Sequence, residues 1–166
     1  MNFNNVQKYD LIFFPSDGSW WDFFIKLVSP KFTHVGIILD PDTHKMFDAN
    51  FFSVGEHEFK AYSGVTVYTI EGLTHFDIKR INSYLESLKT HSDKKYSLFG
   101  GIKAAVLRKL GLTSLTEPKD KYYHCSELMV NIIRQFEPDF FKNVAAENVL
   151  PDDLARWGRL KKVYVF

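Results

Sequence analysis

The single cysteine of the chain is the residue whose type and position most clearly suggest chemistry. Cys125 lies within Tyr-Tyr-His-Cys-Ser-Glu-Leu-Met, residues 122–129, where an amphipathic helical pattern begins. The N-terminus of a helix favours the thiolate, which is the nucleophilic form of cysteine. A small buried core cysteine is the competing interpretation, because free cysteine is among the most buried residue types. The cysteine alone leaves both interpretations open.

A cysteine nucleophile needs a base within reach and a third group that orients the base. Among six histidines, His34 opens the most apolar strand pattern, Thr-His-Val-Gly-Ile-Ile-Leu at 33–39. A turn at 40–43 pairs residues whose numbers sum to about 83, which places His34 close to Asp48 on the next strand. A buried aspartate beside a histidine is the orienting arrangement of a catalytic triad, and a purely structural contact is the alternative.

The other histidines are interpreted differently. His124 is adjacent to Cys125, but neighbouring residues of a helix do not face one another, so we interpret it as a spacer. His57 lies between two glutamates and is predicted on an exposed strand face. The remaining three lie in a turn or in polar surroundings near helix ends: His44, His75 and His91.

No metal or cofactor site is predicted. The sequence contains no CxxC pair, no HExxH motif and no tight histidine cluster, which are the usual signs of a zinc site. Gly100-Gly101 lacks the lysine and the spacing of a phosphate-binding loop.

Composition limits the class of protein. A chain of 166 residues with 45% apolar residues is expected to form one domain, 1–166, with a substantial core. The net charge of +1 and the lack of a basic cluster argue against a nucleic-acid partner. One cysteine excludes an internal disulfide and fits a reducing compartment. The start lacks the pattern of a signal peptide and no apolar run is long enough to span a membrane, so a cytoplasmic location is expected.

The element pattern predicts an α+β fold, in which an antiparallel sheet packs against helices. Most strands are predicted in the first half, at 9–14, 33–39, 45–49, 54–59 and 65–70, with a last strand at 162–166. Helices are predicted at 19–28, 75–88, 96–110, 125–136 and 151–157.

Several of these segments resemble the NlpC-type papain-like cysteine peptidases. The strand block is Tyr-Asp-Leu-Ile-Phe-Phe at 9–14, the segment 33–39, and Met-Phe-Asp-Ala at 46–49. Here the cysteine helix follows the sheet, as in the circularly permuted, YiiX-like branch. Tyr-His-Cys-Ser-Glu-Leu at 123–128 and Leu-Pro-Asp-Asp-Leu-Ala at 150–155 resemble motifs of that branch. The resemblance implies a permuted papain-like fold, with an antiparallel sheet or small barrel packed against helices.

By position, the resemblance implies Cys125 as nucleophile, His34 as base and Asp48 as the third triad residue, where the family more often carries Glu or His. Tyr96 resembles a family tyrosine that lines the site, and it is expected to bind substrate. Tyr9 replaces the usual glycine before Asp10 and is a further substrate-binding candidate.

Two tryptophans just before the His34 strand are also substrate-binding candidates. Trp20 and Trp21 lie in an aromatic segment that the order of the chain places near the groove. One interpretation is core packing of an amphipathic helix. The other is a wall that contacts an acyl chain or a membrane surface.

The expected activity is that of a cysteine hydrolase, an amidase or peptidase, which forms an acyl-enzyme with an amide or ester such as a cell-wall peptide. The permuted order is shared with lecithin:retinol acyltransferase-like enzymes, so a lipid-acyl hydrolase or acyltransferase is an alternative. A non-catalytic binding or virion-associated module is another. The expected partner is a peptide or lipid-acyl substrate, and a cell-wall substrate requires release by lysis or carriage in a phage particle.

Overall fold

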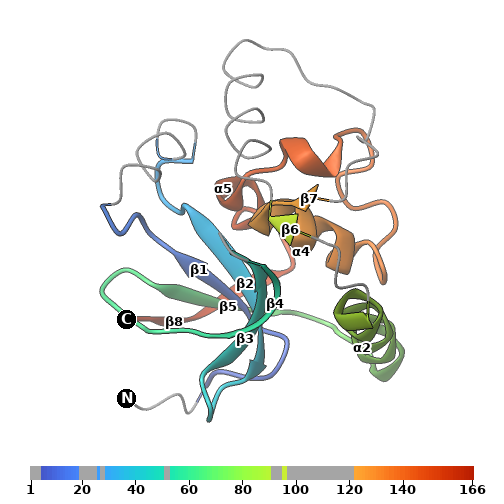
Figure 1. Cartoon of the computed structure of the whole chain (residues 1–166), viewed down its shortest axis with the longest axis horizontal. Coiled ribbons are helices and arrows are strands. Elements are labelled where there is room, and N and C mark those ends of the chain that lie inside the picture. The colour runs from blue at the N-terminus through green and yellow to red at the C-terminus, as the bar shows by residue number, and fades with distance from the viewer. Residues whose placement is uncertain (1–4, 19–25, 27–28, 51–52, 91–94, 97–121) are drawn as a thin grey trace.

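The protein is a six-stranded sheet covered by helices on one face (Figure 1). The structure, a computed structural model, describes residues 5–18, 26, 29–50, 53–90, 95–96 and 122–166. Within them the order of elements is β1 (Leu11–Phe14), β2 (His34–Asp40), β3 (Lys45–Ala49), β4 (Val54–Glu58), β5 (Thr66–Ile70), α2 (His75–Thr90), β6 (Lys95–Tyr96), β7 (Tyr122–Tyr123), α4 (Cys125–Ile133), the 3-10 turn η1 (Ala146–Asn148), α5 (Pro151–Leu154) and β8 (Leu160–Val165).

Six of the strands form one antiparallel sheet in the order β4-β3-β2-β1-β5-β8, as in an α+β fold, and β6 and β7 form a separate parallel pair. The six strands predicted from the sequence are all present. The helix predicted at 96–110 does not begin at Tyr96, because Tyr96 pairs in parallel with Tyr123 as part of β6 and β7. The remainder of that prediction, and the predicted helix 19–28 apart from residue 26, lie outside the described residues. No helix among the described residues combines the length and apolar character needed to cross a membrane.

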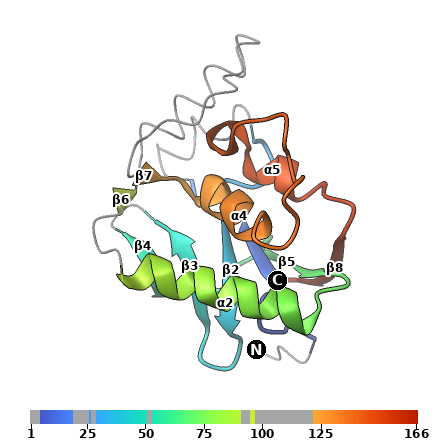
Figure 2. The same ribbon diagram turned by 90° about the vertical axis from the view of Figure 1, so that its right-hand side faces the viewer.

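The main core lies between the sheet and the helices α2 and α4, which cover the same face of the sheet (Figure 2). Alternate residues of β1, β2 and β3 point into this core, where they contact buried residues of both helices. The residues between them point to the opposite face, where a second cluster includes Ile12, Phe14, Ile38 and Met46. Because the central strands are buried on both faces, their sequences are continuous apolar runs.

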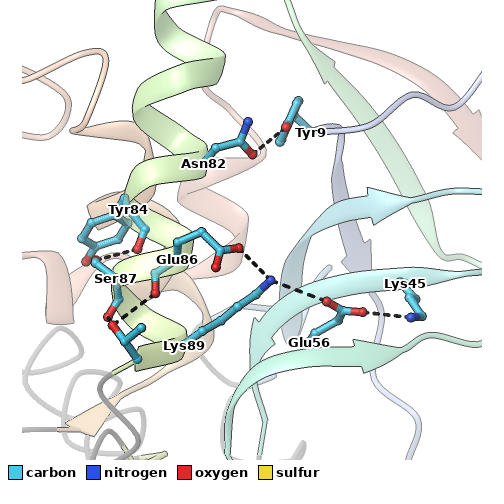
Figure 3. Close-up of polar contacts among 9 residues, drawn as sticks. Tyr9, Lys45, Glu56, Asn82, Tyr84, Glu86, Ser87 and Lys89 are labelled. Carbon is cyan, nitrogen blue, oxygen red and sulfur yellow. Dashed lines mark hydrogen bonds and ion pairs between the residues drawn. The ribbon is translucent and has the colours of Figure 1, made fainter.

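Helix α2 is joined to the sheet by polar contacts at two points (Figure 3). The Tyr9 hydroxyl donates a hydrogen bond of 2.7 Å to Asn82 Oδ1 of α2. Further along, Lys89 of α2 lies 3.8 Å from Glu56 of β4, and Glu56 also pairs with Lys45 of β3 at 3.0 Å. These side chains are substantially exposed, so we expect the ion pairs to orient the helix and to contribute little to stability.

The buried carboxylate of Asp152 fixes the segment that leads into β2. Its two oxygens accept the backbone N–H groups of Lys31, at 3.1 Å, and of Phe32, at 2.8 Å. The backbone N–H of Asp152 donates to Ser29 Oγ, and that hydroxyl donates to the Phe32 carbonyl at 2.6 Å. The Leu-Pro-Asp-Asp-Leu-Ala segment therefore sets where β2, and with it His34, begins.

We predict that Asp152→Ala lowers the free energy of unfolding by about 2 kcal/mol, because the buried N–H of Phe32 and the partly buried N–H of Lys31 lose their acceptor. Urea unfolding followed by circular dichroism measures the change. Asp139→Ala is the control, since 83% of the Asp139 side chain is exposed and it pairs only with a nearby lysine. Equal stability of the two variants would contradict the role assigned to Asp152.

Candidate active site

Cys125 is the first residue of α4, and a histidine cap determines where that helix begins. His124 has extended backbone angles, and its Nδ1 accepts the N–H of Glu127 at 3.3 Å. The Glu127 carboxylate in turn accepts the N–H of His124 at 3.4 Å, which completes a capping box. His124 is thus a helix cap, and it also interacts with the Cys125 side chain, so the interpretation of it as a mere spacer is wrong. Histidine is not a typical cap residue, which is why the pattern did not reveal it.

The cap is locked to the C-terminal part of the chain. His124 Nε2 donates to the carbonyl of Glu147 at 2.8 Å, and the Ser126 hydroxyl donates to the carbonyl of Val149 at 2.7 Å. His124 and Ser126 are both buried. These two bonds hold the first turn of α4, and the thiol on it, in one position relative to η1.

His34 and Asp48 meet as the sequence predicts. His34 is the first residue of β2 and Asp48 lies in β3, and His34 Nε2 is 2.7 Å from Asp48 Oδ2. Asp48 is buried, whereas 25% of the His34 side chain remains exposed. The Phe14 ring packs beside the imidazole, with the ring centroids 5.6 Å apart. Because Asp48 holds the Nε2–H, His34 Nδ1 is the nitrogen left to exchange a proton with a thiol.

Cys125 and His34 interact as an acid and a base. Burial acts to raise the pKa of the Cys125 thiol, but the charge of His34 and hydrogen bonds with His124 and His34 outweigh it, so the pKa is lowered. Burial likewise acts to lower the pKa of His34, but the charge of Cys125 and hydrogen bonds with Asp48 and Cys125 raise it. Both shifts favour a thiolate beside an imidazolium, which is the reactive form of a catalytic cysteine.

His57 belongs to the same group of side chains, and its predicted position on an exposed face is wrong. Its Nδ1 bonds to Asp48 Oδ1, its Nε2 lies 2.9 Å from Ser53 Oγ, and 24% of its side chain is exposed. The reason is the strand register: Asp48 pairs with Gly55 and Met46 pairs with His57. His57 is therefore the diagonal neighbour of Asp48 on the same face. Asn50 and Ser53, which follow β3 and precede β4, are hydrogen-bonded to each other in keeping with this register.

Two glycines flank Asp48 on the neighbouring strands. A Cβ placed on Gly36 of β2 would lie 3.3 Å from Asp48 Cβ and 3.0 Å from Met46 Sδ. Gly55 of β4 stands opposite Asp48, and a Cβ there would meet nothing within 4 Å. With no side chain directly across on either strand, the two imidazoles reach Asp48 diagonally from both sides.

The other predicted site residues are not gathered at this point. Tyr9 precedes β1 by two residues and bonds to Asn82, at the far end of the strand from Phe14 and His34. Tyr96 runs beside Tyr123, two residues before Cys125, so its backbone passes close to the start of α4. Trp20 and Trp21 lie outside the described residues.

The donor atoms of this site do not fit a metal centre. One nitrogen of each imidazole is bonded directly to the Asp48 carboxylate, and the second nitrogen of His57 lies against the Ser53 hydroxyl. Within the described part of the chain, no three His, Cys, Asp or Glu side chains are placed to hold a metal ion.

A scan against protein-family profiles and a search of curated protein sequences each find no match to this chain. Among solved structures, the chain is similar to one described as metalloprotein yiiX from Escherichia coli O157:H7, with a TM-score of 0.63 and 18% sequence identity. The match covers 96% of this chain and 97% of that chain. The similarity therefore extends over the whole length and supports a YiiX-like fold.

We predict that Gly36→Ala is destabilising and Gly55→Ala is tolerated. The added methyl group at position 36 displaces Asp48, and overpacking of this kind costs about 1–3 kcal/mol. The free energy of unfolding and the rate at which Cys125 reacts with iodoacetamide should both fall for Gly36→Ala and stay near wild type for Gly55→Ala. A Gly36→Ala protein with wild-type stability and thiol reactivity would show that Asp48 does not need this space.

Proposed function

We propose that this chain is a cysteine hydrolase that forms an acyl-enzyme with an amide or ester substrate. The observation that carries the proposal is the linked group of Cys125, His34 and Asp48, which come from α4, β2 and β3. Each has the chemistry its role requires: a thiol with a lowered pKa at a helix N-terminus, an imidazole with a raised pKa, and a buried carboxylate bonded to that imidazole. A core cysteine packed for its size needs none of these partners.

In the first half of the proposed reaction, the Cys125 thiolate attacks the substrate carbonyl carbon and forms a C–S bond. The carbonyl oxygen becomes an oxyanion. The first N–H groups of a helix have no intrahelical acceptor, so the backbone N–H of Cys125 is the proposed oxyanion donor. The bond to the leaving group then breaks, and the protonated His34 gives its proton to the departing amine or alcohol.

In the second half, neutral His34 takes a proton from water and the resulting hydroxide attacks the thioester. The C–S bond breaks, the acid product leaves, and the thiolate and imidazolium are restored. Asp48 remains a carboxylate throughout and holds the His34 ring in one tautomer and orientation. No redox step and no external reactant other than water is needed.

The YiiX-like fold and the order of the motifs support a permuted papain-like arrangement as part of this proposal. Peptide amides are the first substrate class, and lipid-acyl esters are the alternative suggested by the sequence resemblance. The related structure is described as a metalloprotein, so each experiment should be repeated in the presence of a chelator. For a metal-free thiol mechanism, EDTA should leave the reactivity of Cys125 unchanged.

We predict that iodoacetamide labels Cys125 at least about tenfold faster than a model thiol at pH 6–7. Labelling should be faster because a thiol with a lowered pKa is ionised at pH values where an ordinary thiol, of pKa about 8.5, is almost fully protonated. His34→Ala should slow labelling in this range, because the cation that stabilises the thiolate is lost. Asp48→Asn should slow it about tenfold, equivalent to one pKa unit.

His75→Ala is the matched control, since it removes an exposed imidazole on α2 and should leave labelling unchanged. Labelling of His34→Ala at the wild-type rate across this range would reject the proposed thiolate–imidazolium pair.

We predict that an activated acyl ester leaves its acyl group on Cys125 and on no other residue. Intact-mass spectrometry and peptide mapping should show one added acyl group on wild type and none on Cys125→Ala. A matched panel of acyl-amide and acyl-ester substrates then distinguishes peptidase from lipid-acyl chemistry by the ratio of kcat/KM values. Reactive Cys125 that is never acylated by any member of the panel would favour the non-catalytic binding module.

A further inference from the structure

We propose that His57 is a positioning residue of this site, which holds Asp48 toward His34 and whose charge sets the pH range of the Cys125–His34 pair. The inference rests on the proposed function, because it concerns how the same site is regulated. It adds a fourth titratable side chain to the three that the sequence identified.

The first observation is that the two oxygens of the Asp48 carboxylate contact two different histidines. Oδ2 contacts His34 Nε2 at 2.7 Å, and Oδ1 contacts His57 Nδ1. A carboxylate only accepts hydrogen bonds, so both imidazoles donate to it. His57 thereby occupies the oxygen that His34 does not use. Without a donor at Oδ1, rotation of the Asp48 side chain would cost less, and the bond to His34 would be less well directed.

The second observation is that the fold builds this contact. The register of β3 and β4 places His57 diagonally across from Asp48, and Gly55 leaves the direct position open. The turn is closed by two hydrogen bonds, from Ser53 N–H to Asn50 Oδ1 at 3.1 Å and from Asn50 N–H to the Ser53 carbonyl at 3.0 Å. These bonds place the Ser53 hydroxyl 2.9 Å from His57 Nε2.

The Ser53 hydroxyl allows His57 to change its charge without changing its contacts. When His57 is neutral, Nδ1–H donates to Asp48 and Nε2 accepts the hydroxyl proton of Ser53. When His57 is protonated, Nε2–H donates to the hydroxyl oxygen, which can act as either donor or acceptor. The same geometry therefore serves both protonation states, and the side chain is partly exposed to solvent, so protons can exchange.

The charge of His57 affects the rest of the site through Asp48. The hydrogen bond to Asp48 raises the pKa of His57, against the opposing effects of partial burial and of the charge on His34. When His57 is protonated, the positive charges of His34 and His57 balance the negative charges of the Cys125 thiolate and the Asp48 carboxylate. Loss of that positive charge raises the pKa of every acid nearby. The Cys125 thiol, which ionises in the range where His57 is still protonated, should then lose its proton at higher pH.

The other charged groups around β4 are engaged elsewhere. Glu56 is adjacent to His57 in the strand and points to the opposite face, where it pairs with Lys45 of β3 and Lys89 of α2 (Figure 3). Glu58 follows His57 in the strand, so it points to the same face as Glu56, where it is exposed. Asp48 from β3 and His34 from β2 are thus the charged groups that act on His57.

The test measures the rate of iodoacetamide labelling of Cys125 in the full chain from pH 4.5 to 10.5. The wild-type profile should have an acid transition, where the thiolate forms, and an alkaline transition, where His34 loses its proton. His57→Asn keeps a neutral N–H donor near the position of Nδ1 and removes the charge. It should shift the acid transition, where His57 is protonated in the wild type, to higher pH by roughly 0.3 to 1 unit and leave the plateau rate within about twofold. His57→Ala also removes the donor and should lower the plateau rate as well.

His75→Asn, an exposed histidine on α2, is the control and should reproduce the wild-type profile. A His57→Asn profile whose acid transition coincides with wild type would overturn the inference, and this variant decides it even if His57→Ala does not fold. The readout needs no turnover. A shifted acid transition without acylation by any substrate would leave the role of His57 standing and reject the hydrolase assignment. Acylation of Cys125 together with coincident profiles would support the hydrolase assignment and reject the role of His57.

Discussion

The site depends on one buried negative charge. Asp48 is almost completely removed from water, and an isolated carboxylate in that position would be strongly destabilising. Burial opposes the ionisation of Asp48, but hydrogen bonds from His34 and His57 outweigh that effect and keep the pKa of the carboxyl low. The same requirement fixes both imidazoles, because each must turn an N–H toward the carboxylate. The tautomer of His34, and hence the nitrogen that faces the thiol, follows from the need to satisfy Asp48.

The nucleophile and the base are also tied to each other through the C-terminal segment. Glu147 accepts the bond from the His124 cap, and Val149 accepts the bond from Ser126, so this segment holds the start of α4. A few residues later, Asp152 holds the backbone before β2. Residues 147–152 therefore fix the positions of the Cys125 thiol and the His34 imidazole relative to each other, although neither residue lies in this segment. Catalytic geometry requires positions accurate to fractions of an ångström, and these buried bonds provide a physical basis for that accuracy.

The sequence predicted the parts of the site that depend on local pattern. The apolar runs identified β1, β2 and β3, and a turn between the last two brought His34 to Asp48, as the 2.7 Å contact confirms. The cysteine helix was evident from its periodicity. What the sequence did not predict depends on register and on partners distant in the chain. His57 was placed on the wrong face because the pairing of β3 with β4 is set by the turn at 50–53. The cap at His124 was missed because histidine is not a typical cap residue, and its bond to Glu147 was missed because Glu147 lies far along the chain.

The electrostatics of the site also suggest how one histidine can serve as acid and then as base. Apart from burial, which lowers it, the strongest influence on the pKa of His34 is the charge of Cys125, which raises it. When Cys125 becomes a thioester, that charge disappears, while the burial that opposes protonation remains. The pKa of His34 then falls at the step where the leaving group needs a proton. The neutral imidazole that results is the form required to activate water, and renewed thiolate formation restores the imidazolium. In the proposed reaction, the bond that forms and breaks at Cys125 therefore controls the proton at His34, while Asp48 keeps the ring in place.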